Sequence, residues 1–286
     1  MALGTGHNTT TTCAVLVPEV WDQDALDIIK KKYVFADTVT RKDSVVAGKG
    51  DTIHVPVYTR GTANDKAALT QVTLQGQTFP EIPVLIDKHK EYSDLVEDIL
   101  KLQSAYELRQ PLLMAATESL AEAVDVDIRD AMVAAFATDI GPGAGNAITE
   151  ATVRAAMVAL DNANVPREDR YLVVSPAGYA DLLGIDRFVS RDFVDEAHGG
   201  QIENGKVGAI LGFDVRMSTN LNVGQGFAYH KESFALAMQQ KPRNQSQYKQ
   251  EYLGHLYTMD TVYGVKGLRD GTTAGAGEWG LLFSNN

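Results

Sequence analysis

The chain of 286 residues contains a single cysteine, Cys13. One cysteine cannot form an intrachain disulfide, and it excludes a zinc site built from several cysteines. Cys13 precedes the apolar run 14–17 without a basic residue or motif beside it. We therefore predict an apolar packing residue rather than a reactive thiol or an intermolecular bridge. This use of cysteine suits synthesis in a reducing cytosol.

Long apolar runs are also missing, and mean hydropathy is -0.15. No run approaches the roughly 20 residues that cross a bilayer. The first residues lead into four threonines, Thr9 to Thr12, and lack the basic-then-apolar layout of a signal peptide. We expect no membrane partner.

Positive charge is scarce, with 26 lysines and arginines against 37 acidic residues and a net charge of -11. A protein that grips nucleic acid normally carries a basic stripe, because its affinity comes largely from neutralising phosphates. The densest basic run, Lys30 to Lys32, follows several acidic residues closely enough to be neutralised locally. The composition indicates that DNA is not bound specifically, although an acidic protein can still enclose it.

One segment comes close to a phosphate-binding motif. Residues Gly200 to Lys206 match the first seven positions of a P-loop, but Val207 stands where Ser or Thr would hold Mg²⁺. The sequence before it does not predict a buried strand, and the sequence after it does not predict a helix. We interpret the segment as a glycine-bearing loop.

The sequence shows no evident pattern of a metal-binding or catalytic site. The six histidines are His7, His54, His89, His198, His230 and His255. No two have the spacing of a helical metal pair. Asp125, Asp127 and Asp130 surround Arg129 on a predicted helix, and we interpret them as a solvated face rather than an acid–base cluster. We predict no catalytic, cofactor-binding or metal-binding residues, no cofactor, and no enzyme activity.

The first 48 residues do not form a core of their own. Within Val20 to Ile29, apolar side chains recur at helical spacing. Tyr33, Phe35 and Val39 then alternate, which predicts extended chain. The segment resembles an arm that must lie on something else.

The next segment changes to an alternating pattern. Thr52–Tyr58 and Leu69–Leu74 alternate apolar with polar residues and predict two strands. The polar stretch between them contains the turn-forming Gly61, and Pro80 and Pro83 precede a return at 84–86. Because an isolated hairpin is marginal in water, we expect this long excursion to pack on another molecule.

Two helices follow, a short one predicted over 94–100 and a long one over about 107–137. Apolar residues of the long helix recur every four positions, at Leu112, Ala116, Leu120, Val124 and Ile128. At 1.5 Å per residue it would extend roughly 45 Å.

Residues 148–224 have the pattern of a compact α/β block. A helix is predicted over 149–162 and a buried strand over 171–174, and Ser175-Pro176 provides an N-cap and first-turn proline for a helix to Leu183. A strand pair broken at Gly212 is predicted over 207–217. Further strands are predicted over 226–229, 234–238, 248–256 and 261–268.

The order of these parts and the amino-acid sequences of four segments resemble those of the major capsid proteins of tailed bacteriophages, which have the HK97-like fold. The segments are Asn164–Leu183, Gly205–Val215, Ala228–Ala237 and Asp260–Lys266. The resemblance implies an α+β fold with an N-terminal arm (1–48), an extended E-loop hairpin (49–88), a P domain (89–147) with its spine helix, an α/β A domain (148–224) and a β-rich return to the P domain (225–286).

The resemblance also implies a function. The chain would self-assemble into pentamers and hexamers of an icosahedral virion capsid around double-stranded DNA, after synthesis in the host cytoplasm. A portal protein is an implied partner, and the resemblance is compatible with a decoration protein. Some members begin with a long helical region that acts as a built-in scaffold, which the Thr-rich start of this sequence cannot do, so we predict a separate scaffolding protein. Lys66 lies near the expected E-loop tip, but no asparagine or glutamate matches the isopeptide-forming sites of some members, so we predict non-covalent closure.

Two alternatives stay open on the sequence. An encapsulin, a nanocompartment shell of the same fold, usually begins with a helix, whereas this chain begins with a Thr-rich segment. A soluble α/β nucleotide-binding protein would rest on Gly200 to Lys206 alone.

Overall fold

The computed structural model describes residues 34–43, 50–77, 79–103, 109–143, 147–185, 208–271 and 277–284, apart from the side chains of Lys101 and Arg109. The predictions for Cys13, for residues 20–29 and for the loop 200–206 lie outside the described residues. His7 and His198 lie outside them as well.

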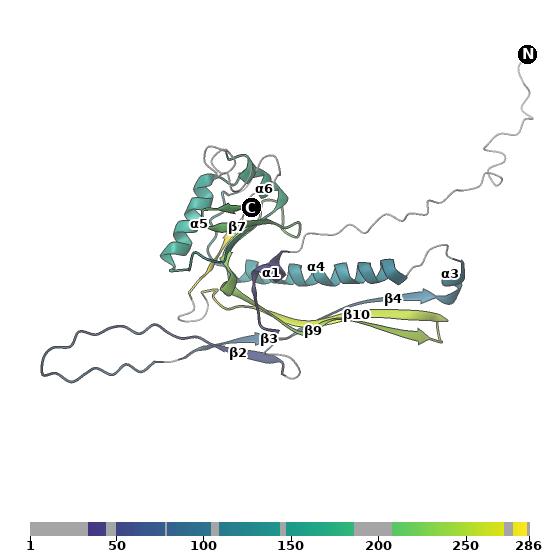
Figure 1. Ribbon diagram of the computed structural model, residues 1–286, viewed down its shortest axis with the longest axis horizontal. Coiled ribbons are helices and arrows are strands. Elements are labelled where there is room, and N and C mark those ends of the chain that lie inside the picture. Colours follow the sequence, from purple (N-terminus) through teal and green to yellow (C-terminus); the bar gives the residue numbers. More distant parts are fainter. Residues whose placement is uncertain are drawn as a thin grey trace, which may run out of the picture.

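Three sheets organise the described chain, and in Figure 1 the four-stranded sheet and the two-stranded hairpin follow the long axis. A four-stranded sheet has the order β1-β9-β10-β4, and a two-stranded hairpin pairs β2 (Thr52–Pro56) with β3 (Glu81–Leu85). A five-stranded sheet has the order β11-β8-β5-β7-β6. The hairpin projects from one end of the molecule, and the four-stranded sheet extends to the other (Figure 1).

The four-stranded sheet carries the longest elements. Its strands are β1 (Thr40–Arg41), β4 (Lys88–Glu97), β9 (Phe234–Lys249) and β10 (Gly254–Gly267). Helix α4 (Arg109–Ala135) lies along one face of it (Figure 1). Its 27 residues span roughly 40 Å. The predicted long helix is confirmed.

The period-four pattern of α4 is the reason for this packing. The buried side chains on the helix are Ala116, Leu120, Val124, Ile128 and Met132. Several of them share a cluster with Phe234 and Leu236 of β9 and with Tyr263 of β10. Burying one large apolar side chain contributes about 2 kcal/mol, so the repeat fixes the helix on the sheet.

The five-stranded sheet forms the compact block above the long sheet in Figure 1. Its strands are β5 (Arg170–Val174), β6 (Ala209–Ile210), β7 (Phe213–Met217), β8 (Gly226–His230) and β11 (Gly280–Phe283). The short 3-10 helix η3 (Lys231–Ser233) joins β8 to β9. Successive residues of β5 and β8 point to opposite faces of the sheet and enter two different core clusters. One cluster contains residues of α5 (Glu150–Asn162), and the other contains residues of α4 and the long sheet, so the five-stranded sheet packs against both.

The helices of this block begin where their caps predict. Thr149 caps α5 (Glu150–Asn162), and Ser175 caps α6 (Pro176–Leu183) by accepting from the N–H of Gly178. The strand pair β6–β7 turns at Gly212, whose φ of 85° favours glycine. These predictions are confirmed. Residues after 224 supply strands to both large sheets, since β8 and β11 pair in one and β9 and β10 in the other.

Four local predictions are wrong. Residues 35–38 form a short helix, α1 (Phe35–Thr38), rather than extended chain. β4 stays in its ladder with β10 to Glu97, so helix α3 (Asp98–Gln103) starts later than predicted. A turn at 250–253 interrupts the strand predicted over 248–256. Residues 69–74 pair with no strand among the described residues, although their pattern alternates.

Candidate assembly surfaces

The hairpin pairs only at its base. β2 (Thr52–Pro56) runs antiparallel to β3 (Glu81–Leu85), and Val57 N–H donates to Pro80 O at 2.7 Å. Beyond this bond, the arms 57–66 and 70–77 separate and enclose a space of about 530 Å³. The side chain of Gln75 reaches across to the backbone of Thr62. The arms therefore lack the ladder that would make them a self-sufficient hairpin.

The arms and the residues next to them expose large apolar side chains. They are Tyr58, Leu69, Val72, Leu74 and Phe79. Tyr58 and Phe79 meet edge to face with ring centroids 5.5 Å apart, but Leu74 is 89% exposed. Apolar side chains gathered on one projection, with no core beneath them, mark a surface that another molecule covers.

The base of the hairpin, in contrast, is fixed to the long sheet. Ile53 and Val84 are buried with Ala237 of β9 in a small cluster. Gln239 adds a bond from its side-chain Nε2 to Gly50 O at 2.9 Å. A Cβ at Gly264 of β10 would overlap the carbonyl oxygen of Leu85, so the backbones of β10 and β3 touch. The direction of the projection is thus set by packing.

A second apolar surface lies at the opposite end of the molecule. Its exposed side chains come from α3 and from the turn between β9 and β10: Ile99, Leu100, Leu102, Tyr252 and Leu253. Asp98 joins the two parts, because its N–H donates to Leu253 O at 2.9 Å and its carboxylate accepts from Tyr248 at 2.8 Å. The molecule therefore has exposed apolar surface at both ends.

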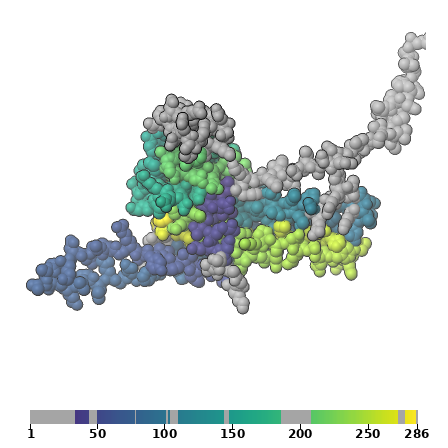
Figure 2. Space-filling view, in the orientation of Figure 1, coloured from purple at the N-terminus to yellow at the C-terminus, as the bar shows by residue number. Residues whose placement is uncertain are grey.

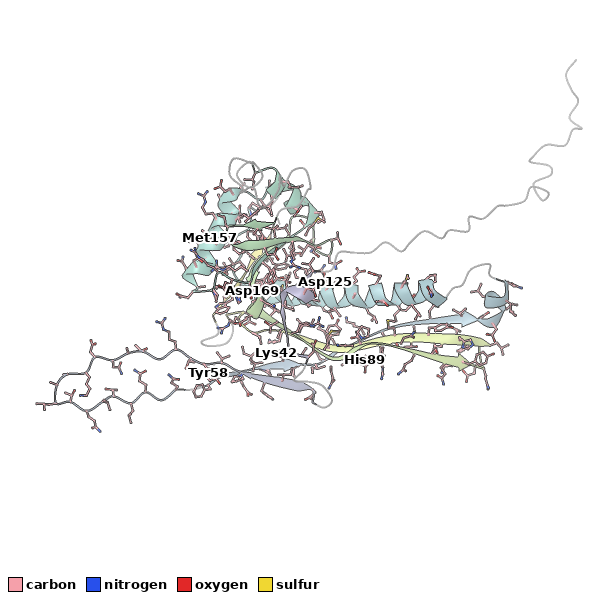
Figure 3. The ribbon with its side chains drawn as sticks, viewed as in Figure 1. Lys42, Tyr58, His89, Asp125, Met157 and Asp169 are labelled. Atoms are coloured by element: carbon pink, nitrogen blue, oxygen red, sulfur yellow. The ribbon has the colours of Figure 1, made fainter. Side chains whose placement is uncertain are left out.

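Asp125 joins three parts of the chain and corrects the prediction of a solvated carboxylate face. It lies on α4 but is buried beneath α1 (Figure 3). Its carboxylate accepts from the N–H groups of Val34 and Phe35 at 3.1 and 2.8 Å, and from Asn220 Nδ2 at 2.8 Å. Burial raises the pKa of Asp125, although these hydrogen bonds act to lower it. Asp125 therefore fixes the start of α1 against α4.

The two other aspartates of this part of α4, Asp127 and Asp130, differ from Asp125 in exposure and in their partners. Asp127 is half-buried and accepts from Tyr263 Oη at 2.7 Å, with Lys88 and Lys90 nearby at 3.5 and 3.3 Å. Asp130 is exposed and pairs with Arg129 at 2.6 Å. The prediction of a solvated face holds only for Asp130.

The face of the long sheet opposite α4 carries a polar cluster around Asp260. Its carboxylate accepts from Arg243 Nε at 2.8 Å and from Gln240 Nε2 at 2.8 Å. His89, labelled in Figure 3, lies 3.2 Å away through Nε2. The hydrogen bond from Arg243 lowers the pKa of Asp260 to about 2. These groups tie β4, β9 and β10 together across one face.

We predict that Asp260→Asn removes a stabilisation that depends on pH. A carboxyl whose pKa is lower in the folded state stabilises the fold above its ordinary value of about 3.9, and this is lost as pH falls through the folded value of about 2. Urea unfolding of unassembled protein should show a difference between the two proteins that is constant above about pH 4 and shrinks toward pH 2. Glu251→Gln, in an exposed turn, is the control. A difference independent of pH would contradict the assignment.

The remaining described histidines have local partners. His54 Nδ1 lies 3.1 Å from Glu81, His230 accepts from Glu232 N–H at 3.1 Å, and the His255 ring contacts Tyr248. Within the described ranges, no three His, Cys, Asp or Glu side chains are placed to hold a metal. Among the described helices, none has the length and apolar character that crossing a membrane requires.

Comparison with known proteins decides the family. The profile of a family described as phage capsid protein matches residues 35–265, which is most of the chain. The chain belongs to this phage capsid family. It is a structural protein of the virion shell, a major capsid protein, and such subunits assemble with their own copies. This membership favours the capsid over the encapsulin and nucleotide-binding alternatives.

Solved structures agree on the fold. A structure of Mycobacterium phage Che8 is 26% identical, with a TM-score of 0.76 over 94% of this chain and 97% of that chain. The capsid of cyanophage P-SCSP1u is 18% identical, with a TM-score of 0.75 over 99% and 97%. The mature capsid of bacteriophage PhiM1 is 13% identical, with a TM-score of 0.73 over 94% and 91%. The capsid protein therefore has the HK97-like fold. A comparison with curated proteins finds no match.

Proposed function

We propose that this capsid protein forms pentamers and hexamers that close into an icosahedral shell around double-stranded DNA. The observation that carries the proposal is the hairpin, whose base is fixed and whose arms expose apolar side chains without a core. Such a projection is stable only when a neighbouring copy covers it. Many modest contacts of this kind, repeated around a closed shell, give a stable assembly.

Within this proposal the parts of the chain take separate roles. Residues 1–48 act as the arm, 49–88 as the E-loop, 89–147 as the P domain with α4 as spine helix, and 148–224 as the A domain. The segment 225–286 supplies long strands to the P domain and two strands to the sheet of the A domain. The A domains would meet around the five-fold and six-fold axes.

The proposed relation to DNA follows from charge. A net charge of -11 suits a shell that encloses DNA without gripping its phosphates. We propose a separate scaffolding protein and a portal, assembly in the host cytoplasm, and non-covalent closure. A decoration protein would bind the finished shell. In this role the chain needs neither a catalytic residue nor a cofactor.

Negative-stain electron microscopy tests the proposal, on the purified protein alone and coexpressed with its neighbouring reading frames. We expect capsomer rings or closed polyhedral shells, with uniform shells requiring the scaffolding partner. A monodisperse monomer under every condition would contradict the assembly. A ladder of multimers on a denaturing gel would contradict non-covalent closure.

A further inference from the structure

The arm of residues 70–77 has the properties of a strand without a partner. It is extended and exposed, and no charged side chain occurs between Ala67 and Pro80. Thr70, Val72 and Thr73 favour strands. The facing arm does not pair with it, because the space of about 530 Å³ separates the two. An uncharged, β-prone segment that has no partner strand pairs readily with an open sheet edge.

Strand β4 offers such an edge. It is the last strand of the long sheet, and its ten residues pair with β10 in a continuous register. Asp98 N–H donates to Leu253 O at 2.9 Å in the same register. Hydrogen-bonded pairs alternate along an antiparallel ladder, so the even-numbered residues of β4 bond to β10. The odd-numbered residues direct their N–H and C=O groups to the open side: His89, Glu91, Ser93, Leu95 and Glu97.

The other open edges are less suitable. β6 and β1 have two residues each, β11 has four, and β2 and β3 at the base of the hairpin have five each. The far half of β9 also lies open, but it contains Pro242, which has no N–H, and an irregular register beside it. Proline and irregularity are features that block pairing at an edge. Within the described ranges, β4 is the long and regular edge.

We infer that the arm 70–77 of one copy adds as a strand to the β4 edge of a second copy. The lengths agree, because at about 3.3 Å per residue the arm spans roughly 26 Å and β4 roughly 33 Å. The arm brings no charge to an edge that carries Lys88, Lys90 and Glu91, so no like charges meet. The inference rests on the proposed shell assembly and names the contact within it.

The placement of the two surfaces makes this contact repeat. The hairpin extends from one end of the long axis, and β4 runs toward the other end (Figure 1). Figure 2 shows the hairpin as a thin projection that stands clear of the rest of the molecule. A copy cannot place its own arm on its own β4, so each copy gives an arm to one neighbour and receives one from another. Such head-to-tail contacts close into rings when the rotation between copies allows it.

Hydrogen exchange with single-residue fragmentation tests the pairing on unassembled protein and on shells. We expect every second amide of 70–77, on the side that faces β4, and the odd-numbered amides 91, 93 and 95 to slow at least tenfold on assembly. The even-numbered amides 92, 94 and 96 should be slow in both states, because β10 already holds them. Shells in which the odd-numbered amides stay fast would overturn the inference and leave the proposed function intact. Absence of shells under all conditions would contradict both.

A matched pair of variants gives a second test. Ser93→Pro removes one outward N–H and the hydroxyl that contacts Thr258, but it keeps every backbone bond to β10, and proline is tolerated on an open edge. Ser93→Thr keeps the N–H and a hydroxyl that can reach Thr258, as Ser93 does at 3.2 Å. We expect shell yield to fall at least tenfold for Ser93→Pro and to stay within twofold for Ser93→Thr. Equal yields from two folded variants would overturn the inference, and if Ser93→Pro does not fold, the exchange measurement decides.

Discussion

Replacing Asp125 with alanine is expected to lower the free energy of unfolding by about 3 kcal/mol. The Asp125 carboxylate is buried, and it accepts from the backbone N–H groups of Val34 and Phe35 and from Asn220. Its removal leaves three donors without a partner inside the protein, each of which costs about 1 kcal/mol or more. Relief of the buried charge offsets part of this loss. Urea unfolding of unassembled protein measures the difference.

Asp125→Asn is the matched variant and should behave differently. An asparagine oxygen can still accept from Val34 and Phe35, but its NH₂ would face the NH₂ of Asn220. Rotation of the Asn220 amide solves this, because Asn220 Oδ1 is buried and has no hydrogen-bond partner among the described residues. We therefore expect Asp125→Asn to lose less than about 1 kcal/mol. Equal losses from Asp125→Ala and Asp125→Asn would contradict the assigned hydrogen bonds.

The difference in stability between the wild-type protein and Asp125→Asn should depend on pH. Burial raises the pKa of Asp125, so the folded state holds its proton more tightly than the unfolded chain does. The contribution of this group to stability is therefore greatest below its ordinary pKa of about 3.9 and declines as pH rises toward the folded value. Asp125→Asn removes this decline, and the variant should gain on the wild-type protein as pH rises from about 4. The lowered pKa of Asp260 has the opposite effect, because its contribution to stability grows as pH rises. Asp260→Asn removes that contribution alone, so the contributions of Asp125 and Asp260 can be measured separately.

Local signals predicted the parts of the fold that depend on one segment alone. The period of four from Ala116 to Ile128 predicted α4, because an apolar stripe on a helix must be buried. Ser175 and Pro176 predicted the start of α6, because a cap needs only its own turn. The alternation of 52–58 and the lack of residues to cover it predicted a hairpin that depends on a partner.

Features made by distant residues could not be predicted in this way. Asp125 looks like a solvated acid in the sequence, and only the return of residues 34–38 across α4 buries it. The same contact turns an alternating segment into α1, since a carboxylate satisfies the N–H groups at its start. The edge of β4 was missed because Leu95 and Val96 fit a helix locally, whereas pairing with β10 holds them in a strand. In each case a tertiary contact overrides the local preference.

Gly264→Ala is expected to lower the free energy of unfolding by about 3 kcal/mol and to prevent shell formation. A Cβ at this position would overlap the carbonyl oxygen of Leu85 and approach Ile86 Cα at 3.0 Å. These atoms belong to the backbone and have no alternative rotamer. The clash is relieved only if β3 lifts away from β10, which opens the cluster of Ile53, Val84 and Ala237 at the base of the hairpin. The arms would then leave the chain in a different direction. Urea unfolding and electron microscopy measure the two effects.

Gly208→Ala separates the loss of a glycine from the loss of this contact. No atom lies within 4 Å of a Cβ at Gly208, which is exposed and directly precedes β6, outside the hairpin. We expect stability to change by less than about 0.5 kcal/mol and shells to form as before. If Gly264→Ala forms normal shells with unchanged stability, the base of the hairpin is not rigid. If it is destabilised but still forms shells, the direction of the arms is set by the neighbouring copy that receives them and not by the packing of β3 on β10.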